Sequence, residues 1–94
     1  AEKVAVRYSA NHVFDYIELT DEFSIYEIPP LPEWVGKNLV EANIRHKYHI
    51  SVLATKKEGK AKLMPPATYV IQEDEHLMVI GKKTDIDSIL KKLP

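Results

Sequence analysis

The sequence contains no cysteine, only three glycines and a single tryptophan among its 94 residues. Without cysteine the chain can form neither a disulfide nor a thiolate zinc site, which fits a reducing cytoplasm. Its uninterrupted apolar runs are only a few residues long, too short to cross a bilayer. Basic and acidic residues nearly balance, 13 against 14, so charge predicts no attraction to nucleic acid or to a membrane surface.

The composition that remains is that of a small globular domain. Hydrophobic residues make up 45% of the chain and charged residues 29%, which are ordinary proportions for a soluble domain. A chain of this length builds one core, and we expect oligomerisation or attachment to a larger protein to support it. The first residues have no secretory apolar region and begin with alanine, which predicts a fragment or a processed form.

The N-terminal third predicts a helix followed by a β-hairpin. Residues 1–10 lack proline and glycine and place their apolar side chains on one helical face, so we expect the end of a linker helix there. Apolar and polar residues alternate in 13–19 and again in 23–28, which is typical of two strands joined by a polar turn. The proline-rich segment 29–32 ends this pairing and predicts an extended crossing.

The middle of the chain predicts one capped helix. Asn38 is followed three residues later by Glu41, the capping-box arrangement. Val40, Ile44 and Tyr48 have the spacing of the buried stripe of a continuous helix. The prediction is therefore a single helix from Asn38 to the end of this stripe.

A surface ion pair and a second hairpin are predicted from the next residues. Glu41 and Arg45 have the i, i+4 spacing of an ion pair on a helix surface. Segments 50–55 and 61–64 read as two strands around the loop KKEGK, in which Gly59 supplies a positive φ. Apolar residues on both faces of the first of these strands predict an interior position in the sheet, with Ile50, Val52 and Ala54 sharing one face.

The C-terminal third predicts a strand and a helix. The segment 72–76 is expected to form an exposed acidic turn before a strand at 77–80. Thr84 is expected to cap the last helix, whose apolar stripe consists of Ile86, Ile89, Leu90 and Leu93. Together the elements predict an α+β domain with a small, mainly antiparallel sheet and flanking helices.

Residues that could carry chemistry do not form a recognised catalytic pattern. His46 and His49 have no third metal ligand nearby, which favours solvated turn residues over a metal site. Ser51 has no neighbouring base, which argues against a serine nucleophile. The acidic run 73–75 could join the two histidines in a metal-dependent enzyme only if the fold brought them together. The residues alone therefore predict a small module that is not an enzyme.

Four ordered segments resemble a known family, namely DYIELTDEFSIYEI at 15–28, VGKNLVEANIRHKYHISVLATKK at 35–57, PPATYVI at 65–71 and HLMVIGKKTDI at 76–86. They are similar to the C-terminal regulatory domain, termed RCK-C or TrkA-C, of the cytoplasmic gating subunits of Trk/Ktr-type potassium uptake systems. The resemblance implies a TrkA-C-like fold that pairs as a two-fold dimer. It further implies that residues 13–94 form this domain and that residues 1–12 are a linker helix from an N-terminal Rossmann domain.

The resemblance also implies a function and its partners. In the family, a ring of subunits docks on a membrane potassium transporter, and in Ktr-type members the dimer cleft binds cyclic di-AMP, which inhibits potassium uptake. We therefore expect a cytoplasmic, dimerising, ligand-sensing domain at the inner face of the membrane, with no nucleic-acid partner and no resident metal. The positions that match the family's ligand pocket are Leu39, Ile44, Arg45, Ser51, Val52 and Pro65.

The chemistry of these positions fits a dinucleotide. Arg45 can offer its guanidinium fork to a phosphate, and the same residue of a second subunit can do so across the two-fold axis. The apolar positions can form walls for adenine. Ser51 stands where ligand-binding Ktr proteins usually have an asparagine able to form two hydrogen bonds to an adenine edge. The alternative interpretation is a structural dimerisation module of the same subunit that binds no ligand of its own.

Overall fold

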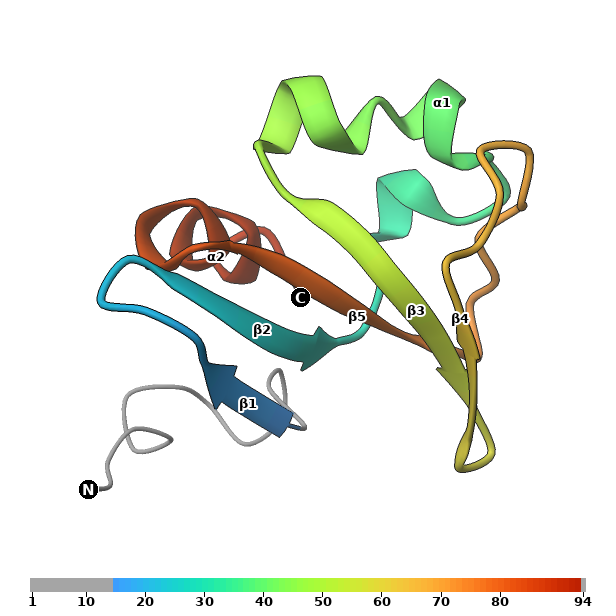
Figure 1. Cartoon of the computed structure of the whole chain (residues 1–94). Helices are drawn as coiled ribbons and strands as arrows, with labels where there is room; N and C mark the ends of the chain where they lie inside the picture. The colour runs from blue at the N-terminus through green and yellow to red at the C-terminus, as the bar shows by residue number, and fades with distance from the viewer. Residues whose placement is uncertain (1–14, 94) are drawn as a thin grey trace.

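A five-stranded antiparallel sheet dominates the computed structural model, which describes residues 15–93. Its elements are β1 (Asp15–Glu18), β2 (Phe23–Ile28), α1 (Leu39–Ala42), β3 (Ser51–Lys57), β4 (Lys60–Leu63), β5 (His76–Lys82) and α2 (Lys83–Leu90), with a 3-10 turn at Pro32–Trp34 and a π-helical turn at Ile44–Tyr48. The strand order is β1-β2-β5-β3-β4 (Figure 1). The predicted α+β class is confirmed. Within the described part of the chain, no helix is long and apolar enough to cross a membrane.

The first hairpin is confirmed wherever it is described. β1 pairs antiparallel with β2, which places Tyr16 opposite Tyr26, and the two rings meet edge to face at 4.9 Å between centroids. The side-chain oxygen of Thr20 accepts hydrogen bonds from the backbone amides of Glu22 and Phe23, which stabilises the intervening turn. The predicted linker helix at 1–12 and the first two residues of the predicted strand lie outside the described residues.

The sheet has one covered face and one open face. Side chains alternate along β5, so that Leu77 and Val79 are fully buried while Met78 and Ile80 are half-buried on the opposite side. The covered face packs against α2 and the helical turns (Figure 1). Its core consists of Tyr26, Ile28, Leu31, Trp34, Ala42, Ile44, Tyr48, Ile50, Ile71, Leu77, Val79, Ile86 and Ile89.

The proline-rich crossing is more structured than predicted. Instead of remaining extended throughout, it forms the 3-10 turn that begins at Pro32, where a missing backbone N–H costs nothing. The turn buries the Trp34 side chain to 1% exposure and sets its ring edge to face against Tyr48 at 5.2 Å. Tertiary burial of the single tryptophan thus accompanies a local conformation that the proline pattern did not reveal.

The predicted continuous helix is wrong beyond its first turn. The capping box is confirmed, because the amide of Glu41 donates to Asn38 Oδ1 at 2.8 Å and the amide of Asn38 donates to Glu41 Oε1 at 2.9 Å. Helix α1 then ends at Asn43, whose left-handed backbone (φ 52°, ψ 41°) interrupts the helix before the π-helical turn. Because of this break, Val40 does not join the buried stripe and is 66% exposed, whereas Ile44 is buried.

Strand β3 contains a β-bulge between Val52 and Ala54. Val52 lies opposite Val79 and Ala54 lies opposite Met78. Since those two partners face opposite sides of the sheet, the prediction that Val52 and Ala54 share one face is wrong. The predicted interior position of the strand is confirmed, because β3 lies between β5 and β4.

The remaining boundaries differ in detail. The β3–β4 connection is a two-residue turn at Glu58 and Gly59, both with positive φ, so the strands extend further into KKEGK than predicted. Helix α2 begins one residue before Thr84 and has no side-chain cap, so that predicted cap is wrong. Its predicted apolar stripe is confirmed, with Ile86 and Ile89 buried in the core.

Candidate functional site

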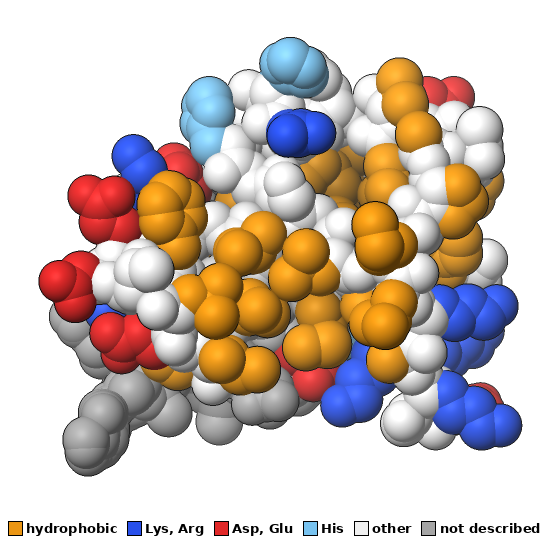
Figure 2. Space-filling model, in the orientation of Figure 1, with side chains coloured by type: hydrophobic (Ala, Val, Ile, Leu, Met, Phe, Trp, Pro, Cys, Tyr) orange, Lys and Arg blue, Asp and Glu red, His pale blue; other side chains and the backbone are white. Residues whose placement is uncertain are grey.

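A groove opens where the helical turns meet the start of β3 and the segment after β4. Its volume is about 450 Å³, and its lining consists of Leu39, Val40, Asn43, Ile44, Arg45, His46, Ile50, Ser51, Val52, Pro65 and Ala67. All six site residues predicted from the sequence are among them. Figure 2 shows apolar side chains gathered over the strands below the helical turns, with few charged groups among them.

The break at Asn43 builds the upper wall of this groove. The amide of Asn43 donates to the carbonyl of Val40 at 3.0 Å, and its own carbonyl accepts from the amide of Lys47 at 2.9 Å. The backbone is therefore held on both sides of the change in direction. Ile44 then turns into the core at 3% exposure, and this anchor leaves the adjacent Arg45 exposed at the rim.

The segment after β4 builds the opposite wall. Pro65 follows Met64, whose positive φ of 52° turns the chain away from the strand. Further along, the amide of Gly36 donates to the carbonyl of Ile71 and the amide of Ile71 donates to the carbonyl of Lys37, both at 2.9 Å. These bonds tie the end of the segment to the residues that lead into α1. Two walls that are far apart in sequence are thus connected through backbone hydrogen bonds.

The polar side chains of the groove have no partner among the residues that the structure describes. Among residues 15–93, the side chains of Asn43, Arg45, His46 and Ser51 make no hydrogen bond or ion pair. The predicted pair of Arg45 with Glu41 is absent from this part of the chain, because the left-handed residue between them removes the helical i, i+4 geometry. A guanidinium, a carboxamide, an imidazole and a hydroxyl therefore remain available to a ligand.

Five lining residues were missed from the sequence: Val40, Asn43, His46, Ile50 and Ala67. Asparagine tolerates the left-handed conformation better than most residues, and this preference at Asn43 could have signalled the break. The contribution of Ala67 could not be read locally, because it depends on where the chain runs after β4.

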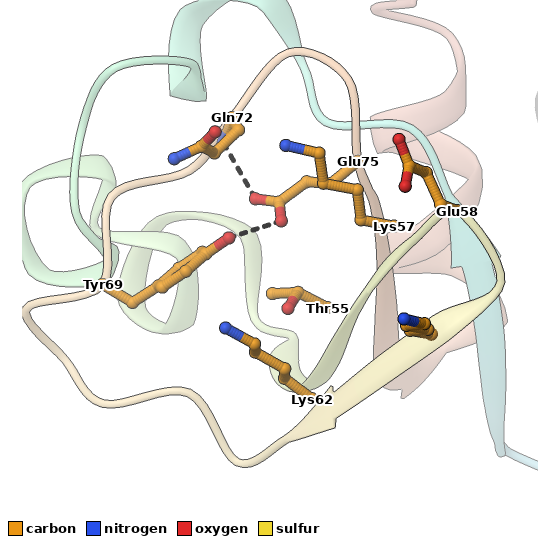
Figure 3. Close-up of a pocket in the computed structure, with 8 residues that line it drawn as sticks. Thr55, Lys57, Glu58, Lys62, Tyr69, Gln72 and Glu75 are labelled. Atoms are coloured by element: carbon orange, nitrogen blue, oxygen red, sulfur yellow. Dashed lines mark hydrogen bonds between the residues drawn. The ribbon is translucent and has the colours of Figure 1, made fainter.

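A second pocket of about 340 Å³ lies beneath the β3–β4 hairpin, and the carboxylate of Glu75 in its lining is hydrogen-bonded (Figure 3). The Tyr69 hydroxyl donates to one carboxylate oxygen of Glu75, and the amide of Gln72 donates to the other at 2.8 Å. Lys57 pairs with Asp74 at 3.1 Å. Glu75 is only 2% exposed, so the prediction of an exposed acidic turn is wrong at this residue.

The hydroxyl of Tyr69 is held in its neutral form in this pocket. Desolvation by burial, together with the hydrogen bond to Glu75 and the negative charge of that carboxylate, raises the pKa of Tyr69 to about 12. The hydroxyl therefore remains a hydrogen-bond donor to Glu75 at physiological pH. This arrangement fastens the segment after β4 to the sheet.

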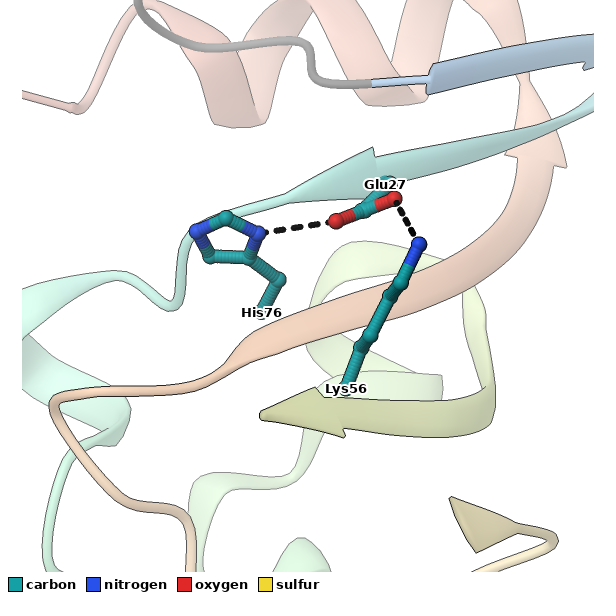
Figure 4. A network of polar contacts seen from close by, with 3 residues as sticks. All are labelled: Glu27, Lys56 and His76. Carbon is teal, nitrogen blue, oxygen red and sulfur yellow. Dashed lines mark hydrogen bonds and ion pairs between the residues drawn. The ribbon is translucent and has the colours of Figure 1, made fainter. Parts of the chain in front are cut away.

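A network of three polar side chains lies across the three central strands on the open face. The carboxylate of Glu27, on β2, is 7% exposed and contacts His76 Nδ1 at 2.8 Å and Lys56 Nζ at 3.4 Å (Figure 4). Because the strands bring these three residues together from distant parts of the sequence, the network links β2, β5 and β3. We assign it a role in holding the strands in register.

No set of three or more metal-ligating side chains comes together within residues 15–93. His46 and His49 are both exposed, and the carboxylate of Glu75 is engaged by Tyr69 and Gln72. The described residues thus offer no arrangement for the metal-dependent alternative considered from the sequence.

The comparison with family models identifies the class of this domain. The model described as the TrkA-C domain matches residues 23–93. The chain belongs to the TrkA-C domain family.

Curated relatives support this membership. The chain is 37% identical over 93 residues to the Ktr system potassium uptake protein C of Bacillus subtilis (strain 168), and 36% identical over 84 residues to the Ktr system potassium uptake protein A of the same organism. It matches 42% and 38% of the lengths of these relatives, so it spans about two fifths of each.

Solved structures agree with the fold. The RCK C domain of the potassium transport protein KtrA, in complex with cyclic diadenosine monophosphate, matches with a TM-score of 0.68 and 25% identity, over 78% of this chain and 86% of that one. The RCK_C domain dimer of S. agalactiae BusR, also in complex with cyclic di-AMP, matches with a TM-score of 0.63 and 26% identity, over 72% of this chain and 86% of that one.

Proposed function

We propose that this chain is the ligand-sensing regulatory domain of a potassium transport gating subunit and that it binds cyclic di-AMP in a cleft between two copies of itself. Binding inhibits potassium uptake. The observation that carries this proposal is the groove, which gathers all six sequence-predicted residues and whose polar side chains have no partner among residues 15–93. The KtrA and BusR domains in complex with the same ligand support it.

The residues of the groove divide between the two parts of the ligand. Arg45 is exposed at the rim, where its guanidinium can make charge-assisted hydrogen bonds to a phosphate. Leu39, Val52 and Pro65 are half-buried and form apolar walls against which a purine ring can pack. A mixed surface of this kind suits a nucleotide better than a purely polar or a purely apolar ligand.

A second copy completes the site in this proposal. Val40, Leu63 and Met64 are 66%, 76% and 83% exposed, and Val40 lines the groove while Met64 precedes its wall residue Pro65. Covering such apolar side chains stabilises an interface. A two-fold axis beside the groove would also place two copies of Arg45 near the two phosphates of a symmetric ligand, one from each subunit.

The remaining assignments follow from the family and extend beyond the chain. We propose that residues 13–94 form the regulatory domain and that residues 1–12 lead into it from a Rossmann domain. We further propose that the full subunits assemble as a ring on a membrane potassium transporter at the cytoplasmic face. In this arrangement the domain works as a regulator and not as an enzyme, and nucleic acid is not among its partners.

Isothermal titration calorimetry with cyclic di-AMP tests the ligand. We expect saturable binding by the unaltered chain and a loss of affinity of about ten- to a hundredfold for Arg45→Ala, since hydrogen bonds to charged groups contribute about 1.5–3 kcal/mol. Lys47→Ala is the matched control, because it removes a positive charge from the same turn without altering the lining of the groove. No heat at tens of micromolar ligand would rule out the ligand assignment.

The exposed apolar residues also support the alternative of a structural dimerisation module without its own ligand. Light scattering over a wide concentration range separates the two. A dimer that is stable without ligand and gives no heat with cyclic di-AMP supports the structural module. A monomer at all concentrations, with and without ligand, contradicts both.

A further inference from the structure

We infer that Asn43 is a specificity-determining residue of the groove and that its carboxamide selects an adenine base over a guanine base. This inference rests on the proposed function. Asn43 lines the groove beside Ile44 and Arg45, and it contributes the one carboxamide among the groove's lining residues. The residue does not belong to the set predicted from the sequence.

The backbone of Asn43 explains its conformation but makes no use of its side chain. Its amide and carbonyl are bonded to Val40 and Lys47. Asn43 is the C-cap residue of α1 and also the N-cap residue of the π-helical turn. As the N-cap residue of that turn, its side chain makes no capping hydrogen bond. The carboxamide is exposed and has no hydrogen-bond partner in the described part of the chain. A donor and an acceptor on a well-anchored backbone are thus presented to the groove.

The chemistry of the purine edge decides what such a group recognises. Adenine presents an amino donor next to a ring-nitrogen acceptor, and the carboxamide of asparagine complements this pair with its own oxygen and N–H. Guanine presents two acceptors on the corresponding edge, which suit an arginine or a lysine instead. If Arg45 is engaged by a phosphate, the remaining groups of the groove favour adenine.

The other polar side chains cannot supply this recognition alone. Ser51 carries one hydroxyl, which can both donate and accept but only from a single atom. The two ring nitrogens of His46 point in different directions, so they cannot both form hydrogen bonds to one edge of a base. With Arg45 engaged by a phosphate, Asn43 is the side chain of the described groove lining that can make a two-point contact to a base edge.

Asparagine is also a common residue at left-handed positions, so its presence alone could reflect the backbone only. Asn43→Gly separates the two explanations, because glycine adopts this conformation readily and removes only the carboxamide. We expect the thermal unfolding midpoint to be maintained. A purely backbone role predicts unchanged ligand binding, whereas a role in recognition predicts a change in base selectivity.

Calorimetry with cyclic di-AMP and cyclic di-GMP tests the inference on the full chain. For Asn43→Gly we expect cyclic di-AMP affinity to fall by about tenfold or more, the usual discrimination by a two-point base contact, while affinity for cyclic di-GMP does not fall. The ratio of cyclic di-AMP affinity to cyclic di-GMP affinity is therefore expected to be smaller for Asn43→Gly than for the unaltered chain. Lys47→Ala, a substitution on the same turn but outside the groove lining, is the control.

Three outcomes would overturn the inference. Equal binding of cyclic di-AMP by Asn43→Gly and the unaltered chain would show that the carboxamide is unused, while the proposed function would stand. An equal loss of affinity for both dinucleotides would assign Asn43 a structural role. No binding of cyclic di-AMP by the unaltered chain would remove the proposed function and this inference together.

Discussion

The groove beside Arg45 and the pocket beneath the β3–β4 hairpin both have polar residues in their lining, but only in the pocket are two described lining side chains, Tyr69 and Glu75, hydrogen-bonded to each other. In the hairpin pocket, Tyr69, Gln72 and Glu75 are joined by hydrogen bonds, and Lys57 reaches Asp74. In the groove, the side chain of Arg45 and its polar neighbours have no partner among the described residues.

This difference separates stability from recognition. Engaged polar groups lower the free energy of the folded chain, and removing one leaves its partners unpaired. Unengaged polar groups contribute little to folding, but they are free to bond to a ligand. Substitutions in the hairpin pocket should therefore change the free energy of unfolding, and substitutions in the groove should change ligand affinity.

The largest effect is expected from Glu75→Ala. The buried carboxylate accepts two hydrogen bonds, so its loss leaves the Tyr69 hydroxyl and the Gln72 amide without their acceptor. We expect the free energy of unfolding to fall by about 2–3 kcal/mol in urea denaturation. Glu73→Ala, an exposed acid of the same segment, should change it by less than about 0.5 kcal/mol. Equal effects of the two substitutions would contradict the contrast between the two regions.

The pH dependence of stability should reveal Tyr69. Its pKa is raised from 10.0 to about 12 by burial and by Glu75, so above pH 10 the unfolded chain loses this proton more readily than the folded chain. The stabilising contribution of Tyr69 is complete below pH 10 and is lost as the pH rises toward 12.

The comparison with Tyr69→Phe isolates this contribution. We expect the variant to be less stable by about 1 kcal/mol at neutral pH, and we expect this difference to shrink between pH 10 and 12. Urea unfolding of both proteins at pH 8, 10 and 11.5 measures it. A difference that stays constant across this range would show that the pKa is not raised.

Ser51→Asn should tighten binding in the groove. A carboxamide at the start of β3 reaches further than a hydroxyl and can form a second hydrogen bond to the base. We expect cyclic di-AMP affinity to rise by about three- to tenfold, equivalent to roughly 1 kcal/mol. Calorimetry measures the change, with Ser51→Ala as the control expected to bind no better than the unaltered chain. Weaker binding by Ser51→Asn would place the base elsewhere in the groove.

The smallest expected effect is that of Arg45→Ala on folding. The side chain is exposed and unpaired within the described residues, so its removal should change the free energy of unfolding by less than about 0.5 kcal/mol. Thermal and urea unfolding of the ligand-free chain check this. A loss above 1 kcal/mol would mean that Arg45 supports the fold, and its effect on binding would then need another explanation.

Much of the fold was predictable because its signals are local. The strands predicted at 23–28 and 77–80, the capping box at Asn38 and the apolar stripe of α2 each depend on residues close in sequence, and each is confirmed. The six expected groove residues also came together, although that expectation came from the resemblance to a family.

The errors concern features that local patterns do not decide. A helix-like stripe continued through Asn43, but the helix breaks there, and Ile44 and Tyr48 are buried while Val40 is exposed. The acidic turn was expected in water, but Glu75 is buried because Tyr69 and the Gln72 amide supply donors for its carboxylate. At Glu75, the hydrogen bonds supplied by the packed chain thus outweigh the preference of a carboxylate for water.

By itself, the sequence determined the class of the domain, the order of its strands along the chain and the nature of its core, since apolar periodicity specifies which side chains leave water. Only the tertiary structure decided which polar groups were satisfied. It paired Glu75 with Tyr69 and left Asn43 and Arg45 without partners within the described residues. Hydrogen bonding depends on distances of about 3 Å between groups that are remote in sequence, and only the packed chain sets those distances.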